Sequence, residues 1–76
     1  MIQWGITSID SKGLTEQKLP ISYSSPSSYH LLTTSLADLD RWSVGIKYSA
    51  SIIKLAITSD GGYHQKGSVD WCTIGY

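Results

Sequence analysis

The sequence predicts a small all-β domain, an antiparallel β-sandwich of about six strands. β-Branched and aromatic residues occur throughout the 76-residue chain, whereas good helix formers are sparse. Apolar residues recur at alternate positions in short runs, and turn-forming residues separate these runs. A chain of this length is expected to form one domain, 1–76.

Residues 1–7 form the first predicted strand. Ile2, Trp4 and Ile6 alternate with polar residues or glycine, which is the two-residue period of a half-buried strand. We expect the side chains of Trp4 and of Trp71, in the last predicted strand, to pack in the core.

Turn-forming and polar sequence separates the other predicted strands. Pro20 is placed at the start of the second strand, because proline donates no hydrogen bond to a sheet. Leu31 and Leu32 are adjacent in the third strand and therefore face opposite sides. The predicted strands after the first are 19–23, 29–35, 41–49, 52–59 and 68–76. The segments between them are a turn at 10–13, linking sequence at 14–18, a break at 24–28, a loop at 36–40, turns at 49–51 and 60–62, and a polar loop at 63–67.

The fourth and fifth predicted strands each have one strongly apolar face. Its members are Trp42, Val44, Ile46 and Tyr48 in the fourth strand, and Ile53, Leu55 and Ile57 in the fifth. Trp42 is also a candidate for stacking on a sugar, because it adjoins the loop at 36–40 and has an extended aromatic face.

The composition argues against several classes of function. Six basic and six acidic residues give a formal net charge of zero, and no basic run is present, so nucleic-acid binding is not expected. No apolar stretch approaches the roughly 18 residues of a transmembrane helix, so membrane insertion is not expected either.

The cysteine and histidine content predicts neither a metal nor a cofactor. Cys72 is the chain's single cysteine and cannot form an internal disulfide, and we expect it to be a small buried hydrophobic residue. His30 and His64 lack a second ligand at zinc spacing. One alternative stays open, in which three symmetry copies of a histidine hold a metal on a trimer axis. Because a chain this small usually needs a staple, oligomerisation remains the candidate source of added stability.

Three motifs together resemble a known family. The chain begins Ile2-Gln3-Trp4-Gly5, continues with Leu19-Pro20-Ile21-Ser22-Tyr23, and ends Trp71-Cys72-Thr73-Ile74-Gly75-Tyr76. In this order and spacing the motifs resemble the C-terminal receptor-binding domain of bacteriophage and prophage tail fibres, the gp53-like tail-fibre tip family. The resemblance covers essentially the whole chain. It departs from the family pattern at Leu19, where an aromatic residue is common, and at Cys72 and Thr73, where small or apolar residues are usual.

This resemblance implies a β-sandwich that assembles as a homotrimer at the tip of a phage or tailocin tail fibre. It implies attachment to a bacterial surface polysaccharide, namely lipopolysaccharide or capsule, or to an outer-membrane protein, without catalysis of a reaction. The domain would then lie in the virion, at the distal end of a fibre made in the host cytoplasm. Met1 leads directly into strand-like sequence, and we expect a longer fibre to precede it.

Three polar segments are the candidate receptor-binding regions. The segment 60–66 combines a glycine turn with an aromatic ring, an imidazole, an amide and an ammonium group, which suit the hydroxyls and phosphates of a glycan. Segments around 29–30 and 38–42 offer aromatic, imidazole, carboxylate and guanidinium groups. The candidate contacts are Tyr29, His30, Asp38, Asp40, Arg41, Trp42, Tyr63, His64, Gln65 and Lys66.

Three other functions stay open at this point. The domain could be purely structural, trimerising or capping a fibre whose receptor contacts lie elsewhere. It could be a standalone lectin-like carbohydrate-binding module. It could also be a small glycan hydrolase, since Asp38 and Asp40 are close enough in sequence to reach the carboxylate separation of about 5–9 Å that glycosidases use.

Overall fold

The computed structural model describes residues 1–10, 13–35, 41–59 and 65–76, with the backbone alone at Ser35 and Arg41. These residues form an all-β fold and include a short 3₁₀ turn, η1, at Pro26–Ser28. The strands are β1 (Ile2–Asp10), β2 (Thr15–Lys18), β3 (Tyr29–Ser35), β4 (Arg41–Lys47), β5 (Ile52–Ser59) and β6 (Lys66–Gly75).

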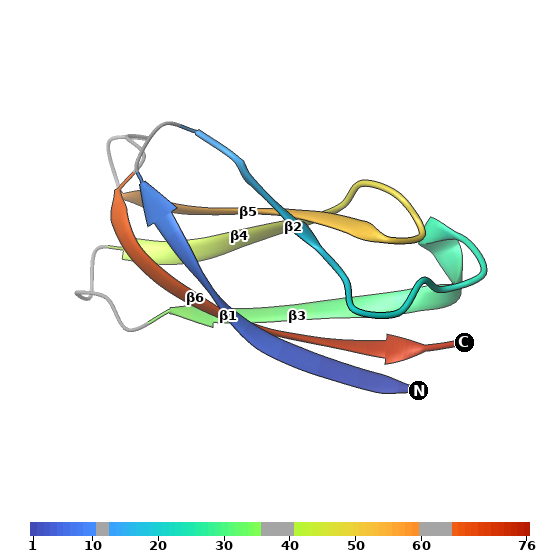
Figure 1. The fold of residues 1–76 in the computed structure, drawn as a ribbon. Coiled ribbons are helices and arrows are strands. Elements are labelled where there is room, and N and C mark those ends of the chain that lie inside the picture. Colours follow the sequence, from blue (N-terminus) through green and yellow to red (C-terminus); the bar gives the residue numbers. More distant parts are fainter. Residues whose placement is uncertain (11–12, 36–40, 60–64) are drawn as a thin grey trace.

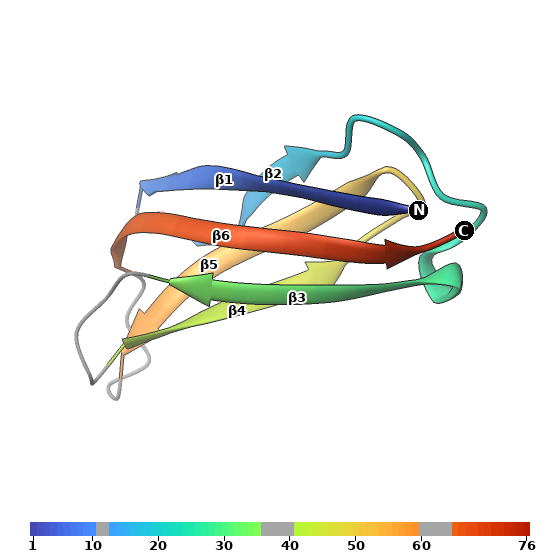
Figure 2. The same cartoon turned by 90° about the horizontal axis from the view of Figure 1, so that it is seen from below.

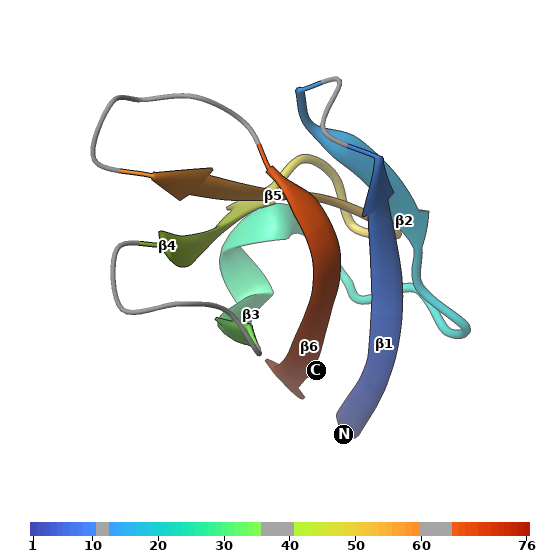
Figure 3. The same cartoon turned by 90° about the vertical axis from the view of Figure 1, so that its left-hand side faces the viewer.

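The described strands form two antiparallel sheets that pack face to face (Figure 1), which confirms the predicted small antiparallel β-sandwich. The strand orders are β1-β6-β3 and β2-β5-β4. β6 is the central strand of its sheet, since β1 and β3 pair with it on either side (Figure 2). The view along the strands shows both sheets around one interior (Figure 3).

The core lies between the two sheets. Ile53, Leu55 and Ile57 from β5 are fully buried, as their alternation predicts, and Val69 and Trp71 from β6 pack against them from the other sheet. The core placement predicted for Trp71 is therefore confirmed. Removal of this apolar surface from water is the dominant stabilisation of a small domain. The remaining buried members of the cluster are Ile9, Leu19, Tyr23 and Tyr29.

The strand predicted at 19–23 is wrong, and β2 instead occupies Thr15–Lys18, which was predicted as linking sequence. Leu19 and Tyr23 are buried, but their backbone N–H groups donate to Ser51 O and Ala50 O in a turn rather than to a strand. Pro20 has no N–H to donate, so the chain leaves the sheet immediately after β2.

β1 has the predicted alternation, but its orientation is opposite to the expected one. Trp4 is 75% exposed, so its predicted core placement is wrong, and the polar residues Gln3 and Thr7 point inward. Gln3 is held by the backbone of Ile21, donating to its carbonyl oxygen and accepting from its N–H at 2.9 Å each. These partners lie far along the chain, and they allow β1 to bury amide and hydroxyl groups without an unpaired atom.

Thr7 joins three side chains inside the sandwich. Its hydroxyl donates to Gln17 Oε1 at 2.7 Å and accepts from the indole N–H of Trp71 at 3.0 Å. Thr7→Val leaves both partners unpaired in a buried site, and we expect the free energy of unfolding to fall by about 1–3 kcal/mol. Denaturant unfolding followed by tryptophan fluorescence measures this change. Thr34→Val, at an exposed position of β3, is the matched control and should alter stability by about 0.5 kcal/mol or less.

The two termini lie together at one end of the sandwich (Figure 1). The amino group of Met1 donates to Gly75 O at 2.7 Å, and Gly75 N–H donates to Met1 O at 3.0 Å. β1, β3 and β5 finish at the opposite end, where β4 and β6 begin. We refer to this second end as the loop end. The longest dimension of the molecule is 35 Å.

Candidate functional site

The outer face of sheet β1-β6-β3, which is turned toward the viewer in Figure 2, points away from the core and yet carries large exposed apolar side chains. Trp4 and Ile6 are 75% and 72% exposed, so neither contributes much to the interior. The strand register aligns this surface, which we name the Trp4 face, into three rows. The rows are Ile2, Ile74 and His30; Trp4, Cys72 and Leu32; and Ile6, Asp70 and Thr34.

Two shallow hollows lie on the Trp4 face, one on each side of β6. The hollow on the β3 side is lined by Leu32, Thr33, Thr34, Asp70, Trp71 and Cys72. The hollow on the β1 side is lined by Trp4, Gly5, Ile6, Asp70 and Trp71. Asp70 borders both, so a half-buried carboxylate lies between two apolar depressions.

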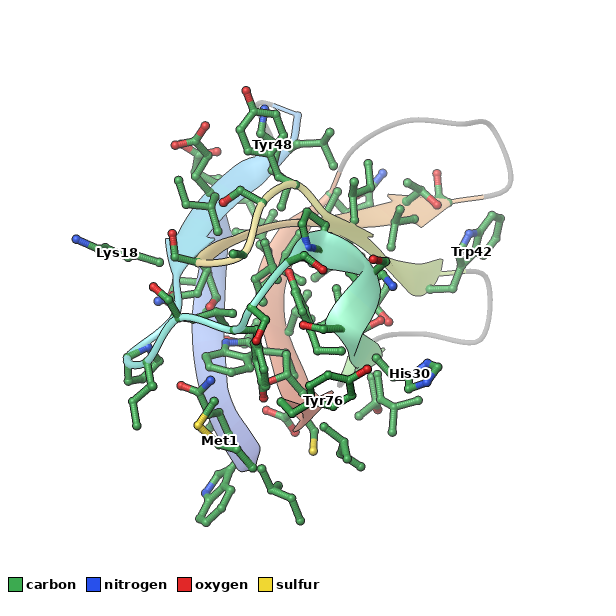
Figure 4. All side chains as sticks on the ribbon, turned by 90° about the vertical axis from the view of Figure 1, so that its right-hand side faces the viewer. Met1, Lys18, His30, Trp42, Tyr48 and Tyr76 are labelled. Atoms are coloured by element: carbon green, nitrogen blue, oxygen red, sulfur yellow. The ribbon has the colours of Figure 1, made fainter. Side chains whose placement is uncertain are left out.

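A second apolar surface, the Trp42 face, lies on the outer side of sheet β2-β5-β4. Trp42, Val44 and Ile46 project from β4 on this side, and Tyr48 follows directly after the strand. Trp42, Ile46 and Tyr48 are 47%, 43% and 57% exposed. Figure 4 shows Trp42 and Tyr48 pointing away from the interior of the sandwich. Their shared face was predicted, but it is the outer one.

Lys54 provides a positive charge on the Trp42 face. Its Nζ lies 3.9 Å from the ring centroid of Tyr48, within cation–π range, and 3.7 Å from a carboxylate oxygen of Glu16. The Glu16 side chain is 61% exposed, so this ion pair is solvated and contributes little to stability.

The inner face of β4 is polar, which is the reverse of the usual pattern for an antiparallel sheet. The hydroxyl groups of Ser43 and Thr33 are hydrogen-bonded at 2.9 Å between the sheets, and Lys47 Nζ donates to Tyr29 O at 2.9 Å. Gly45 lies so close to β3 that an added Cβ would be 2.8 Å from Leu31 Cδ2. β4 therefore turns small and polar groups toward β3 and its apolar ones outward, the same orientation as in β1.

The predicted contact Tyr29 is a core residue. Its side chain is 1% exposed, stacks on Tyr23 with ring centroids 4.4 Å apart, and donates its hydroxyl proton to Ser49 O at 2.9 Å. Burial raises the pKa of the Tyr29 hydroxyl above its ordinary value, and the nearby Tyr23 adds to this rise. The buried ring does not reach the surface at which a receptor contact was predicted.

His30 is separated from the other candidate contacts by the length of the sandwich. It is exposed at the start of β3, near the termini (Figure 4), and belongs to the Trp4 face. Arg41 and Trp42 begin β4 at the loop end, and Gln65 and Lys66 lie there at the start of β6. The candidates Asp38, Asp40, Tyr63 and His64 lie outside the described residues.

Gln65 and Lys66 are presented by a defined backbone. The N–H of Gln65 donates to Ile57 O at 2.8 Å, and its side-chain amide donates to Ser59 Oγ at 3.4 Å. Lys66 is exposed and lies opposite Asp10 in the β1–β6 register. The described residues at this end thus offer an amide, an ammonium and the indole of Trp42.

Cys72 is not the buried residue that was predicted. It is partly exposed at the centre of the Trp4 face, because its side chain points outward from β6 between Trp4 and Leu32.

Within the described part of the chain, no group of three or more histidine, cysteine, aspartate or glutamate residues could hold a metal ion. None of the described segments is a helix long and apolar enough to cross a membrane.

The apolar outer faces were not predicted from the sequence. The signal present in the sequence is an excess of apolar strand faces, since β1, β4, β5 and β6 all alternate and two inner faces cannot hold every apolar side chain. The large exposed residues that reasoning from the sequence missed are Ile2, Ile6, Leu32, Ile46 and Ile74. Exposed apolar patches of this size mark interaction surfaces.

Comparison with known proteins gives no relative. No protein-family model matches the chain, and neither do curated proteins or solved structures. Inferences about function therefore depend on the motifs and surfaces described above.

Proposed function

We propose that this domain is the receptor-binding tip of a phage or tailocin tail fibre. It assembles as a homotrimer and attaches the particle to a bacterial lipopolysaccharide, capsule or outer-membrane protein, without catalysing a reaction. The three motifs at residues 2–5, 19–23 and 71–76 support this proposal through their resemblance to tail-fibre tips.

The structural feature that most supports this proposal is the placement of the termini and the loop end at opposite ends of the elongated sandwich (Figure 1). In a fibre whose shaft precedes Met1, the shaft joins at the terminal end and the loop end points away from the particle. Gln65 and Lys66 lie at that distal end, where β6 begins, and supply an amide and an ammonium. Binding residues on a rigid sandwich concentrate in such places.

Weak contacts at each copy are sufficient for attachment by a trimeric tip. Linking several sites raises avidity by about 10²–10⁴ without any new contact, provided that all sites reach the surface together. Three loop ends on one axis meet that condition.

The test is adsorption of the labelled domain to host cells. Lys66→Glu replaces an exposed ammonium at the loop end with a carboxylate, and we expect binding to host cells to fall by about tenfold or more, since a lost charged contact of 1.5–3 kcal/mol corresponds to at least that factor. Lys18→Glu makes the same charge change at the exposed end of β2, away from the loop end, and should leave adsorption unchanged. Equal adsorption of both variants and the parent would refute binding through the loop end.

A purely structural trimerisation or capping module is the second candidate, and the two apolar outer faces favour it. The two proposals differ in one measurement. If the isolated domain forms trimers but binds no host cell that the intact particle infects, the structural function is correct. Release of reducing ends from host polysaccharide would instead support the hydrolase.

A further inference from the structure

We infer that the Trp4 face of one copy packs on the Trp42 face of the next copy, forming a head-to-tail interface that repeats around the assembly. This inference rests on the homotrimer of the proposed function and identifies the surfaces that build it. The occupant of each apolar face is therefore a second copy of this chain.

Each copy has two apolar outer faces to cover. The Trp4 face and the Trp42 face lie on the outer sides of different sheets, so one neighbour cannot cover both. A two-fold dimer through either face leaves the other in water. With head-to-tail contacts each copy has two neighbours, and a single type of contact buries both faces; the rotation between successive copies decides whether the series closes into a ring.

The exposed apolar area of the Trp4 face suits an interface between proteins. Trp4 is 75% exposed, Ile6 72%, Ile2 and Leu32 58% each, and Ile74 43%. One large aromatic side chain accounts for roughly 150–250 Å² of surface. Together with four aliphatic residues, Trp4 supplies most of the roughly 800 Å² that a standard interface takes from each partner. A soluble monomer seldom exposes so large a continuous patch.

The Trp4 face and the Trp42 face carry opposite charges. Asp70 is half-buried on the Trp4 face, and no described residue forms a hydrogen bond or ion pair with its carboxylate. None of the nine residues in the three rows of that face is a lysine or arginine, so these rows offer no lysine or arginine partner to the Asp70 carboxylate of a second Trp4 face. The Trp42 face instead offers Lys54, whose only described ion pair is the solvated one with Glu16. Head-to-tail packing can therefore pair Asp70 with Lys54 of the next copy, and like charges are kept apart.

Mixing two monomeric variants tests the inference directly. Trp4→Glu disables the Trp4 face and leaves the Trp42 face intact, whereas Ile46→Glu does the reverse. Both positions are exposed, so the fold should persist. Light scattering should give three chain masses for the parent and one for each variant alone, a threefold loss. The equimolar mixture should give two chain masses, because the intact Trp4 face of one variant binds the intact Trp42 face of the other.

Ile21→Glu is the matched control, since Ile21 is 57% exposed and lies outside both faces, and it should remain trimeric. If either variant forms dimers on its own, the interface is two-fold and the inference is wrong. If both variants stay trimeric, another surface forms the trimer, which overturns the inference but not the proposed assembly. If the parent is monomeric at millimolar concentration, the inference and the trimer of the proposed function both fail.

Two further readouts keep the test decisive. Leu32→Glu and Trp42→Glu replace the first pair if circular dichroism shows that one of those variants is unfolded. If Trp4→Glu remains trimeric but loses adsorption to host cells, the Trp4 face is a ligand platform rather than an interface between copies. That result would overturn the inference while supporting receptor binding.

Discussion

A chain that ends after Asp70 is expected not to fold. The missing segment 71–76 includes the half of β6 that pairs with the first half of β1 and with most of β3. It also removes Trp71 and Thr73 from the core, and Thr73 shares a buried hydrogen bond of 2.7 Å with the hydroxyl of Tyr23. β1 and β3 would be left as unpaired strands at this end, and a two-layer core cannot form beneath them.

Circular dichroism and amide dispersion in NMR spectra measure this outcome. Deletion of Tyr76 alone is the control, because its side chain is 80% exposed and its backbone makes only peripheral bonds to Ser24 and Ser28. We expect that deletion to cost about 1 kcal/mol. Cooperative unfolding of the chain that ends at Asp70 would show that the end of β6 is peripheral.

Gly75→Ala is expected to lower the free energy of unfolding by about 3 kcal/mol, at the upper end of the usual range for overpacking. A Cβ at this position would collide with the carbonyl oxygen of Ser28 and would be 2.5 Å from Cα of Tyr29. These are backbone atoms, so no rotamer change can relieve the clash. Either β3 or the end of β6 must move, and the hydrogen bonds between Gly75 and Met1 weaken with it.

Thermal and urea unfolding of Gly75→Ala beside Tyr76→Ala separates this steric effect from fraying at the terminus. Tyr76→Ala changes the adjacent residue without adding an atom near the backbone, and its stability should stay within about 0.5 kcal/mol of the parent. Equal stability of the two variants would contradict the close approach of β6 to the Ser28–Tyr29 segment.

The period-two pattern was sufficient to predict most strands. The strands at 29–35 and 52–59 are confirmed with the predicted bounds, and the last strand is confirmed with a start two residues earlier, at Lys66. Leu31 and Leu32 face opposite sides as expected, with Leu31 against the core. Such features depend on local alternation, which the sequence displays directly.

The direction in which each strand faces could not be predicted from alternation alone. β1 turns Gln3 inward because the backbone of Ile21 satisfies its amide, and Thr7 turns inward because Gln17 and Trp71 satisfy its hydroxyl. These contacts join residues 10 to 64 positions apart, and no local pattern reports them. An apolar stripe in the sequence therefore indicates burial, but the burying surface can be another molecule.

The candidate site shows the same division. Turn-rich segments predicted where polar groups gather, and Trp42, Gln65 and Lys66 share one end of the molecule because β4 and β6 begin there. Tyr29 was predicted to be a surface residue, but Tyr23 stacks on its ring and helps to bury it. Tyr23 belongs to the segment before η1, which was predicted as a strand, so no pattern in the sequence indicated this contact. The partners of an aromatic residue decide whether it is a core or a surface group, and tertiary structure sets those partners.

The antiparallel pairing of β1 with β6 has a mechanical consequence. A pulling force between Met1 and the start of β6 at the loop end acts along the two strands and shears them past each other. All the paired residues, from Ile2 with Ile74 to Asp10 with Lys66, then resist the force at the same time. Tension between Met1 and Tyr76 would instead open those pairs one after another from the terminal end. Force applied between Met1 and the loop end would therefore strain this strand pair in its stronger direction.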